Sequence, residues 1–219
     1  MRPDRHFEVY FDFDNTITDF DVLDEIIRRF SVDEEWKVAE AAWERGEIGS
    51  KECLERQFSR VRVSEKVLDD YVRSIRIDPA FGPIVELLGR AGIKPVILSD
   101  SFRSIINVIL ENNQVPGIQV FANEMTIRES EPVLGFPYHQ SICSTAGNCK
   151  TSHLFKRDRL PGTIKVYIGD GRSDICPARF CELLFAKGTL FEHYSPIRDD
   201  CIRFEDLSTV HAHLKGLLS

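Results

Sequence analysis

The sequence predicts an α/β protein with a mostly parallel sheet and a helical segment inserted after its first strand. Strand-like and helix-like segments alternate from Phe7 to the end of the 219 residues, which is typical of a parallel sheet covered by helices. Residues 21–77 interrupt this alternation, because they contain helical patterns and no convincing strand. A chain of this length can bury a substantial core, either as one large domain or as a core with a smaller companion.

The expected strands are short apolar segments that lie between turn signals. The first is FEVYFDF, and FGPIVELLGRAG then predicts a helix that Gly92 closes. MTIRE and PVLGF predict a β-hairpin, and HQSICSTAGNCK predicts an irregular loop that leads to a helix at Thr151. The strands are expected at residues 7–13, 94–99, 118–122 and 164–170, with short ones near 183–186 and 202–204.

The inserted segment predicts a small helical bundle. Its apolar residues recur every three or four positions, as in amphipathic helices, and Pro79 and Pro83 mark the return to the α/β body. We expect a helical domain over residues 19–77, placed above the strand ends of a core made of 1–18 and 78–219. The four helical segments are DVLDEIIRRF, EEWKVAEAAWERG, SKECLERQFSRV and SEKVLDDYVRSI.

Composition limits the partners. The balance of 28 Lys plus Arg against 35 Asp plus Glu gives a net charge of -7, which argues against a nucleic-acid partner held by phosphate neutralisation. The N-terminus has no apolar signal-peptide core, and no stretch approaches the ~20 apolar residues of a spanning helix. We therefore expect a cytoplasmic protein without a membrane partner. The oligomeric state stays open, a homodimer included.

The six cysteines are few and irregular for a disulfide framework, so reduced thiols are expected. Cys143 and Cys149 with Cys176 and Cys181 could be offered as zinc ligands. Their spacings do not match those of zinc knuckles, except loosely in the second pair. The sequence does not tell whether the cysteines have a role beyond packing.

Carboxylates end two of the predicted strands. Asp12 and Asp14 close the first strand and Asp170 closes the fourth. An Asx turn after a strand would also explain Asp14 and Asn15. Because parallel strands present their carboxyl ends at one edge, the three acids are expected to converge, and such crowding needs a compensating cation. All-oxygen ligation favours Mg²⁺.

This grouping predicts phosphoryl chemistry. A carboxylate beside magnesium can attack phosphorus in line, so Asp12 is the candidate nucleophile of an aspartyl-phosphate pathway. Asp14 points to the same side of an extended chain and can protonate the leaving oxygen and later take a proton from water. Ser99 and Lys150 supply a hydroxyl and an ammonium for the phosphoryl oxygens.

In this order, DFDNT (12–16), ILS (97–99), Lys150 and GDGRSD (169–174) resemble the motifs of the haloacid dehalogenase (HAD) superfamily over the whole chain. The resemblance implies a Rossmann-like core and a phosphatase with a C1-type helical cap. It implies that Asp12, the Asp14 carbonyl and Asp170 ligate magnesium and that Asp174 supports the metal site. It further implies that Thr16 orients the nucleophile turn and that Ser99, Asp100, Lys150 and Thr16 form the substrate and phosphate site.

Finer resemblances narrow the branch. ILSDS, YHQSICSTAGNCK and YIGDGRSDICP are similar to the phosphoethanolamine/phosphocholine and pyridoxal-phosphate phosphatases. The cap length and the cysteine-rich loop are similar to the methionine-salvage 2-hydroxy-3-keto-5-methylthiopentenyl-1-phosphate phosphatase. The chain departs from phosphoserine phosphatases, which carry Ser-Gly-Gly where this chain has Ser99-Asp100-Ser101. The expected substrate is a small phosphorylated metabolite.

Other readings stay open. The same intermediate would serve a phosphotransferase, and a catalytically silent phospho-ligand sensor could keep the fold. In the cap, Asp19 and Asp21 are expected as helix caps, although the resemblance also gives Asp21 a contact with a substrate amine. Substrate roles are alternatives to solvent exposure for Arg56 and Arg60, and to structural roles for Tyr138 and His139. Trp36 and Trp43 are expected to pack.

Overall fold

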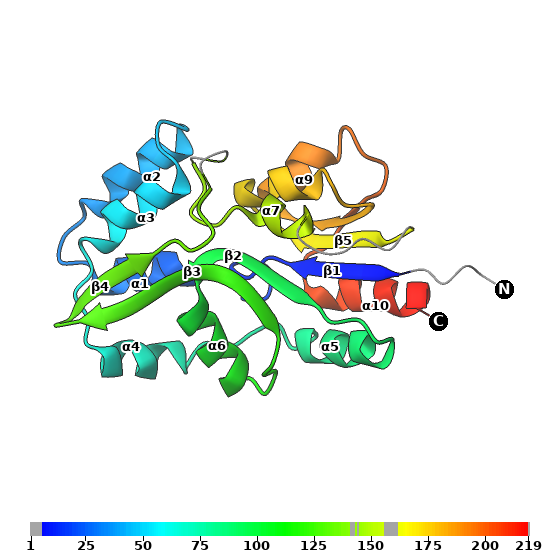
Figure 1. The fold of residues 1–219 in the computed structure, drawn as a ribbon, viewed down its shortest axis with the longest axis horizontal. Coiled ribbons are helices and arrows are strands. Elements are labelled where there is room, and N and C mark those ends of the chain that lie inside the picture. The colour runs from blue at the N-terminus through cyan, green and yellow to red at the C-terminus, as the bar shows by residue number, and fades with distance from the viewer. Residues whose placement is uncertain (1–5, 141–142, 144, 156–161, 219) are drawn as a thin grey trace.

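The computed structural model describes residues 6–140, 143, 145–155 and 162–218, and these confirm the α/β fold. Seven strands form one sheet in the order β4-β3-β2-β1-β5-β6-β7 (Figure 1). Every pair is parallel except β3 and β4. The strands are β1 (Phe7–Phe11), β2 (Val96–Phe102), β3 (Gln119–Arg128), β4 (Glu131–Gly135), β5 (Ile164–Gly169), β6 (Leu183–Ala186) and β7 (Cys201–Arg203).

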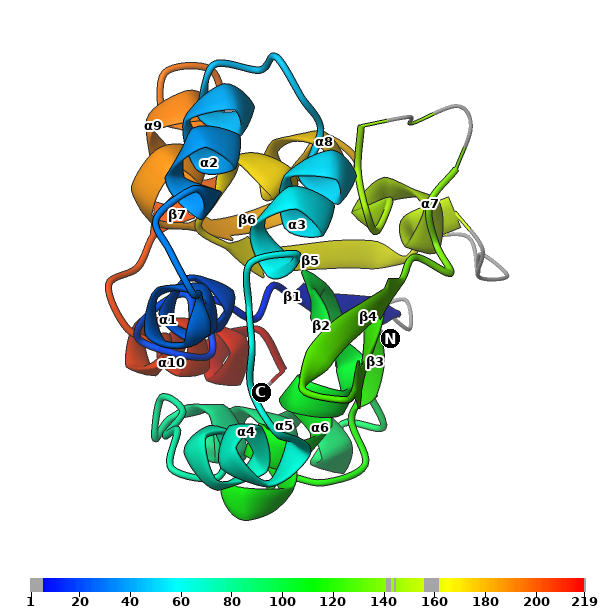
Figure 2. The same cartoon turned by 90° about the vertical axis from the view of Figure 1, so that its left-hand side faces the viewer.

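Successive side chains of the central strands point to opposite faces of the sheet, so they contribute to two separate hydrophobic clusters. Val9 and Phe11 lie in the larger cluster, under α5 (Phe81–Arg90), α6 (Arg103–Asn112) and α10 (Leu207–Leu218). Tyr10 lies in the second cluster, under α7 (Lys150–Phe155), α8 (Ile175–Ala178) and α9 (Gly188–Tyr194). Figure 2 shows these two helical layers on opposite faces of the sheet. Burial on both faces explains why these strands read as nearly continuous apolar runs.

The inserted segment forms the four expected helices, which are α1 (Val22–Phe30), α2 (Trp36–Glu44), α3 (Ser50–Phe58) and α4 (Glu65–Val72). Asp21 caps α1 by accepting a hydrogen bond from Asp24 N, and Ser64 caps α4. The apolar faces of the bundle join the larger core cluster. Phe58 of α3, for example, packs edge-to-face on Phe102, with ring centroids 4.9 Å apart. The cap and the body therefore share one continuous core.

Several element boundaries differ from the sequence prediction. The expected hairpin exists, but its first strand is the continuation of the third strand, so β3 runs unbroken to Arg128. Strand β2 extends past Ser99, and its register shifts between Leu98 and Phe102. Gly92 adopts φ +71 just beyond α5, as expected of a glycine that ends a helix. Among the described residues, no helix combines the length and apolar character that crossing a bilayer requires.

Candidate active site

The turn after β1 places Asp12 and Asp14 at the carboxyl edge of the sheet. Asp12 extends the strand pairing through its backbone N–H, which donates to Ile168 O at 2.8 Å. The chain then turns sharply, because Asn15 has φ +54, a conformation that asparagine tolerates better than most residues. The hydroxyl of Thr16 donates to Asp170 Oδ1 at 3.4 Å, so the turn is tied to the end of β5. The first and fourth predicted strands thus do meet at one edge.

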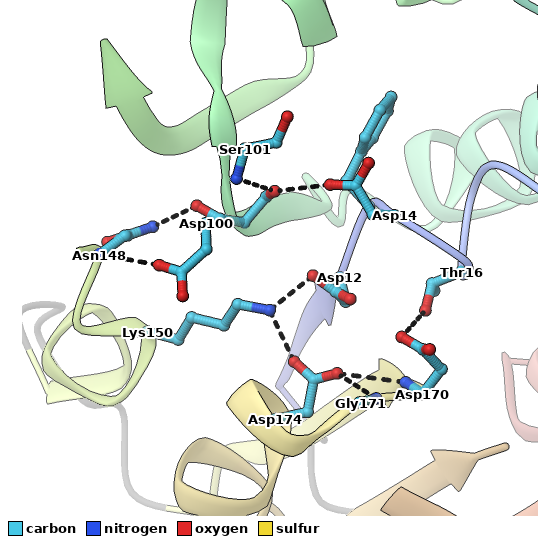
Figure 3. A network of polar contacts seen from close by, with 12 residues as sticks. Asp12, Asp14, Thr16, Asp100, Ser101, Asn148, Lys150, Asp170, Gly171 and Asp174 are labelled. Carbon is cyan, nitrogen blue, oxygen red and sulfur yellow. Dashed lines mark hydrogen bonds and ion pairs between the residues drawn. The ribbon is translucent and has the colours of Figure 1, made fainter. Parts of the chain in front are cut away.

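Lys150 lies between the carboxylates of Asp12 and Asp174 (Figure 3). Its Nζ donates to Asp12 Oδ1 at 2.5 Å and to Asp174 Oδ1 at 2.7 Å, and its side chain is only 3% exposed. Burial opposes the charged form of this amine, but the carboxylates of Asp12, Asp174 and Asp100 raise the Lys150 pKa above its ordinary value. Burial and the Asp174 charge raise the pKa of Asp12, whereas Lys150 lowers it. Lys150 therefore stabilises the anionic form of Asp12.

The carboxylate of Asp174 is fully engaged by the protein. Its Oδ1 accepts from Lys150 and from the Tyr167 hydroxyl at 2.7 Å. Its Oδ2 accepts from the backbone N–H groups of Asp170 at 3.2 Å and Gly171 at 3.0 Å. Gly169 leaves room for this carboxylate, because a Cβ there would lie 2.6 Å from Asp174 Oδ2. A carboxylate has about four lone-pair sites, so Asp174 uses its accepting capacity to position Lys150 and the loop that carries Asp170.

Asp14 is held between the cap and β2. Its Oδ1 accepts from Val22 N at 2.9 Å, at the start of α1, and its Oδ2 accepts from the Ser99 hydroxyl at 3.4 Å. Burial raises the pKa of Asp14, and the neighbouring Asp21 raises it further. A raised pKa favours the protonated carboxyl that a general acid needs at the start of its reaction.

A bulge in β2 places Ser99 and Asp100 at the site. Leu98 pairs with Phe121 and Phe102 with Asn123, so three residues of β2 stand opposite one residue of β3. Asp100, inside this bulge, accepts from Asn148 N at 2.9 Å, and the Asn148 amide donates to Ser99 O and Phe121 O. Asn148 thus fixes the loop immediately before Lys150. Sequence reasoning missed this role, although Asn148 belongs to the quoted N-C-K run.

The cluster suits a magnesium ion. Ligand oxygens of Asp12, Asp170 and Asp174 lie within 4.8 Å of one another, and they form the one such group found among the described residues. Burial raises the pKa of Asp170 to about 6, with Asp174 adding to the effect. An oxygen donor set crowded with negative charge fits a hard divalent cation. The six cysteines are free thiols and none joins this group.

A cavity of about 520 Å³ opens above these residues and is walled by the cap. Four acids of the cap line it: Asp21, Asp24, Glu40 and Glu44. The two basic residues that line it, Lys150 and Arg172, both belong to the body. Sequence analysis singled out only Asp21 of these cap acids. A signal for the others was present, because Glu40 and Glu44 lie four residues apart and face one side of a helix.

Four other substrate candidates, two in the cap and two in the body, lie away from the cavity. Arg56 pairs with Glu52 at 2.5 Å on the exposed side of α3, and Arg60 pairs with Asp33. Tyr138 packs edge-to-face on Phe121 and His153, and the His139 ring lies 2.9 Å from Ala146 O. None of these four lines the cavity. Asp19 is exposed, and Trp36 packs against the core while Trp43 lines the cavity.

Comparisons with known proteins agree with this geometry. The model of a family described as Putative Phosphatase matches residues 7–184. Pdp3-interacting factor 1 of Schizosaccharomyces pombe is 25% identical over 99% of this chain and 98% of its own. A 2-hydroxy-3-keto-5-methylthiopentenyl-1-phosphate phosphatase of Bacillus cereus is 22% identical over 96% and 97%. The chloroplastic phosphoserine phosphatase of Arabidopsis thaliana is 26% identical over 76% of this chain and 57% of its own.

Solved structures show the same fold. A phospho-aspartyl intermediate analogue of phosphoserine phosphatase superposes with a TM-score of 0.72, covering 95% of this chain and 98% of that one at 22% identity. A substrate-bound phosphoserine phosphatase gives 0.69 at 18% identity. The sheet order, the inserted helices and the match over most of the chain lead to one conclusion: the protein belongs to the Putative Phosphatase family and has the fold of HAD-type phosphatases.

Proposed function

We propose that this protein is a magnesium-dependent phosphatase of small phosphorylated metabolites, acting through an aspartyl-phosphate on Asp12. The observation that carries the proposal is the buried cluster in which Lys150 Nζ lies 2.5 Å from Asp12 while Asp170 and Asp174 lie within 4.8 Å. A buried carboxylate whose anionic form is stabilised by a fixed ammonium has the properties of a nucleophile for phosphorus.

The reaction has two halves. An Asp12 oxygen attacks phosphorus, the bond from phosphorus to the leaving oxygen breaks, and Asp14 gives that oxygen a proton. Water then attacks the same phosphorus, Asp14 takes its proton, and inorganic phosphate leaves while Asp12 is regenerated. Lys150 and the Ser99 hydroxyl are proposed to contact the phosphoryl oxygens. Mg²⁺ would be held by Asp12, the Asp14 carbonyl and Asp170, with Asp174 in support, and it would supply positive charge against the phosphoryl group.

The cap acids limit the leaving group. The four carboxylates come from the N-cap and first turn of α1 and from α2. The described cap residues that line the cavity include no Lys or Arg. Negative charge on the leaving group would be repelled there. We therefore propose a leaving group that carries no carboxylate, which disfavours phosphoserine. Asp100, an acceptor beside the cavity, is proposed to face the leaving group rather than the phosphoryl oxygens.

The test is phosphate release from a panel of phosphomonoesters, with and without Mg²⁺. The panel contains phosphoethanolamine, phosphocholine, pyridoxal phosphate, thiamine monophosphate, phosphoserine and a methionine-salvage analogue. We expect magnesium-dependent release and weak turnover of phosphoserine. Full activity in excess chelator would refute the metal assignment. Tight ester binding without turnover would favour the alternative of a catalytically silent phospho-ligand sensor. Transfer of phosphate to an added alcohol would favour the phosphotransferase.

Asp12→Asn is expected to remove turnover, because an amide cannot act as the nucleophile, while the fold stays intact. Asp69→Asn is a matched control, since Asp69 is an exposed residue of α4 that pairs with Arg73. Circular dichroism checks the fold and phosphate release checks the activity. An Asp12→Asn variant with the same phosphatase rate as the control would refute the nucleophile assignment.

A further inference from the structure

The α3 side of the cavity holds a polar side chain that the proposed chemistry does not use. Helix α3 turns Ser50, Cys53, Leu54 and Gln57 toward the cavity. Their spacing of three and four residues defines one helical face. The opposite face is exposed and carries the ion pairs of Glu55 with Lys51 and of Glu52 with Arg56.

Gln57 is nearly buried as a residue, and its amide is reachable only from the cavity. The residue is only 5% exposed, and no hydrogen bond of its side chain is found among the described residues. The hydrogen bonds described for its carbonyl are backbone ones, from Ser59 N–H and from Arg60 N at 3.1 Å. The amide is not among the fully buried polar groups that lack a partner, so water in the open cavity can satisfy it until a bound molecule displaces that water. Since Gln57 lines the cavity, a bound molecule can supply the missing partner.

The other side chains on this face offer no equivalent group. The Ser50 hydroxyl accepts a hydrogen bond from Gly147 N at 3.0 Å. Burial, with Glu40 and Asp24 nearby, raises the pKa of the Cys53 thiol to about 12, so it stays a neutral, weak donor. Leu54 is apolar. The Gln57 NH₂ group is thus the strong neutral donor that this face presents to the cavity.

The surrounding charges decide what Gln57 can bind. Asp24, Glu40 and Glu44 are acceptors when ionised, so they repel a carboxylate and favour a group that donates. Their oxygens are not close enough to form a metal-ligating group, as the cluster of Asp12, Asp170 and Asp174 is among the described residues. A hydroxyl satisfies both requirements, because it can donate to a carboxylate and accept from an amide.

We propose that Gln57 is a specificity-determining residue whose amide donates to a hydroxyl of the leaving group. The inference rests on the proposed phosphatase function and adds to it a substrate class: a phosphomonoester whose leaving group carries a further hydroxyl and no carboxylate. Selectivity follows because an ester that displaces water from the amide without offering a hydroxyl leaves the amide unpaired.

The experiment compares three matched esters: propyl phosphate, glycerol 1-phosphate and 3-phosphoglycerate. They present an apolar end, a hydroxyl end and a carboxylate end to the cap. The wild type should give a kcat/KM for glycerol 1-phosphate about tenfold or more above those for the other two. Gln57→Met should remove that advantage and leave propyl phosphate within about twofold of the wild type. Arg56→Met, one residue away on the exposed face, is the matched control.

The Tm of Gln57→Met distinguishes a role of Gln57 in substrate recognition from a purely structural role. Methionine at 57 is similar in size and replaces an amide that makes no described side-chain hydrogen bond, so the Tm should stay level or rise. Equal losses for all three esters together with a lower Tm would overturn the proposal, and so would a wild type that does not prefer glycerol 1-phosphate to propyl phosphate. If the wild type releases phosphate from no ester in this series or in the wider panel, the proposed function itself fails.

Discussion

The Asp174 side chain acts on the site through other residues. Its four hydrogen bonds hold Lys150, Tyr167 and the backbone of the loop that carries Asp170. It is fully buried, so the protein rather than bulk water supplies its partners, and Lys150 shares its ammonium between Asp174 and Asp12. Partners of this kind orient metal ligands and typically change metal affinity when they are removed.

Asp174→Asn should therefore weaken magnesium binding about 10- to 100-fold and lower kcat, because the amide loses the charge that pairs with Lys150. Isothermal titration with Mg²⁺ and the magnesium dependence of phosphate release measure the two effects. Asp69→Asn again serves as the exposed control. An Asp174→Asn variant with the wild-type magnesium affinity would contradict the positioning role.

The pKa of Asp24 leads to a second prediction, about how stability depends on pH. Desolvation, with added repulsion from Asp21 and Glu40, raises the pKa of this carboxyl from 3.8 to about 7. The folded pKa lies above the unfolded one, so the stability contributed by this group is complete below about pH 4 and is lost as the pH rises through about 7. Asp24→Asn cannot ionise. Its Tm should exceed that of the wild type at pH 8, with the difference shrinking by pH 5.

Thermal melts at the two pH values test this sign. Glu65→Gln, a change in the exposed first turn of α4, controls for loss of one surface carboxylate. The same Tm difference at pH 5 and pH 8 would mean that Asp24 does not titrate in this range.

At the scale of elements, the cap is held against the body at two places. Arg172, in the loop after β5, donates to Glu44 O at 2.5 Å and lies 5.8 Å from the centre of the Trp43 ring. On the other side, Gly49 meets the loop before Lys150 so closely that a Cβ would lie 2.1 Å from Thr145 O. Both contacts join the cap to loops that carry proposed catalytic groups.

Arg172→Met removes the hydrogen bond and the cation–π contact while keeping much of the side-chain length. If the contact of Arg172 with Glu44 and Trp43 favours the closed cap, the KM of Arg172→Met should rise up to about tenfold with a smaller change in kcat. Steady-state kinetics on the best ester of the panel give both parameters. Arg203→Met, an exposed arginine on β7, is the control, and an unchanged KM in Arg172→Met would show that the contact does not favour closure.

At the scale of the whole molecule, local patterns predicted the sheet and the four inserted helices. The ends of β1 and β5 were predictable because parallel strands present their carboxyl ends together. The spacing of Glu40 and Glu44 predicts that they share one side of a helix, but a helical pattern does not tell that this side, or the side of α3 with Gln57, faces the cavity. The bulge at Ser99 and the four contacts of Asp174 depend on residues far apart in the chain. The boundaries of the cap, 19–77, stay a prediction, because the hydrophobic core of the cap is continuous with that of the body.

The central claim is a covalent phosphoryl group on Asp12, and a trapping experiment tests it most directly. Wild type and Asp14→Asn are mixed with p-nitrophenyl phosphate and Mg²⁺, quenched in acid, and mapped by peptide mass spectrometry. This leaving group needs little acid assistance, so Asp14→Asn should form the intermediate and hydrolyse it slowly. We predict one added phosphoryl group on Asp12, more abundant in Asp14→Asn and absent in Asp12→Asn. Turnover with no adduct on Asp12, or an adduct on another residue, would contradict the account.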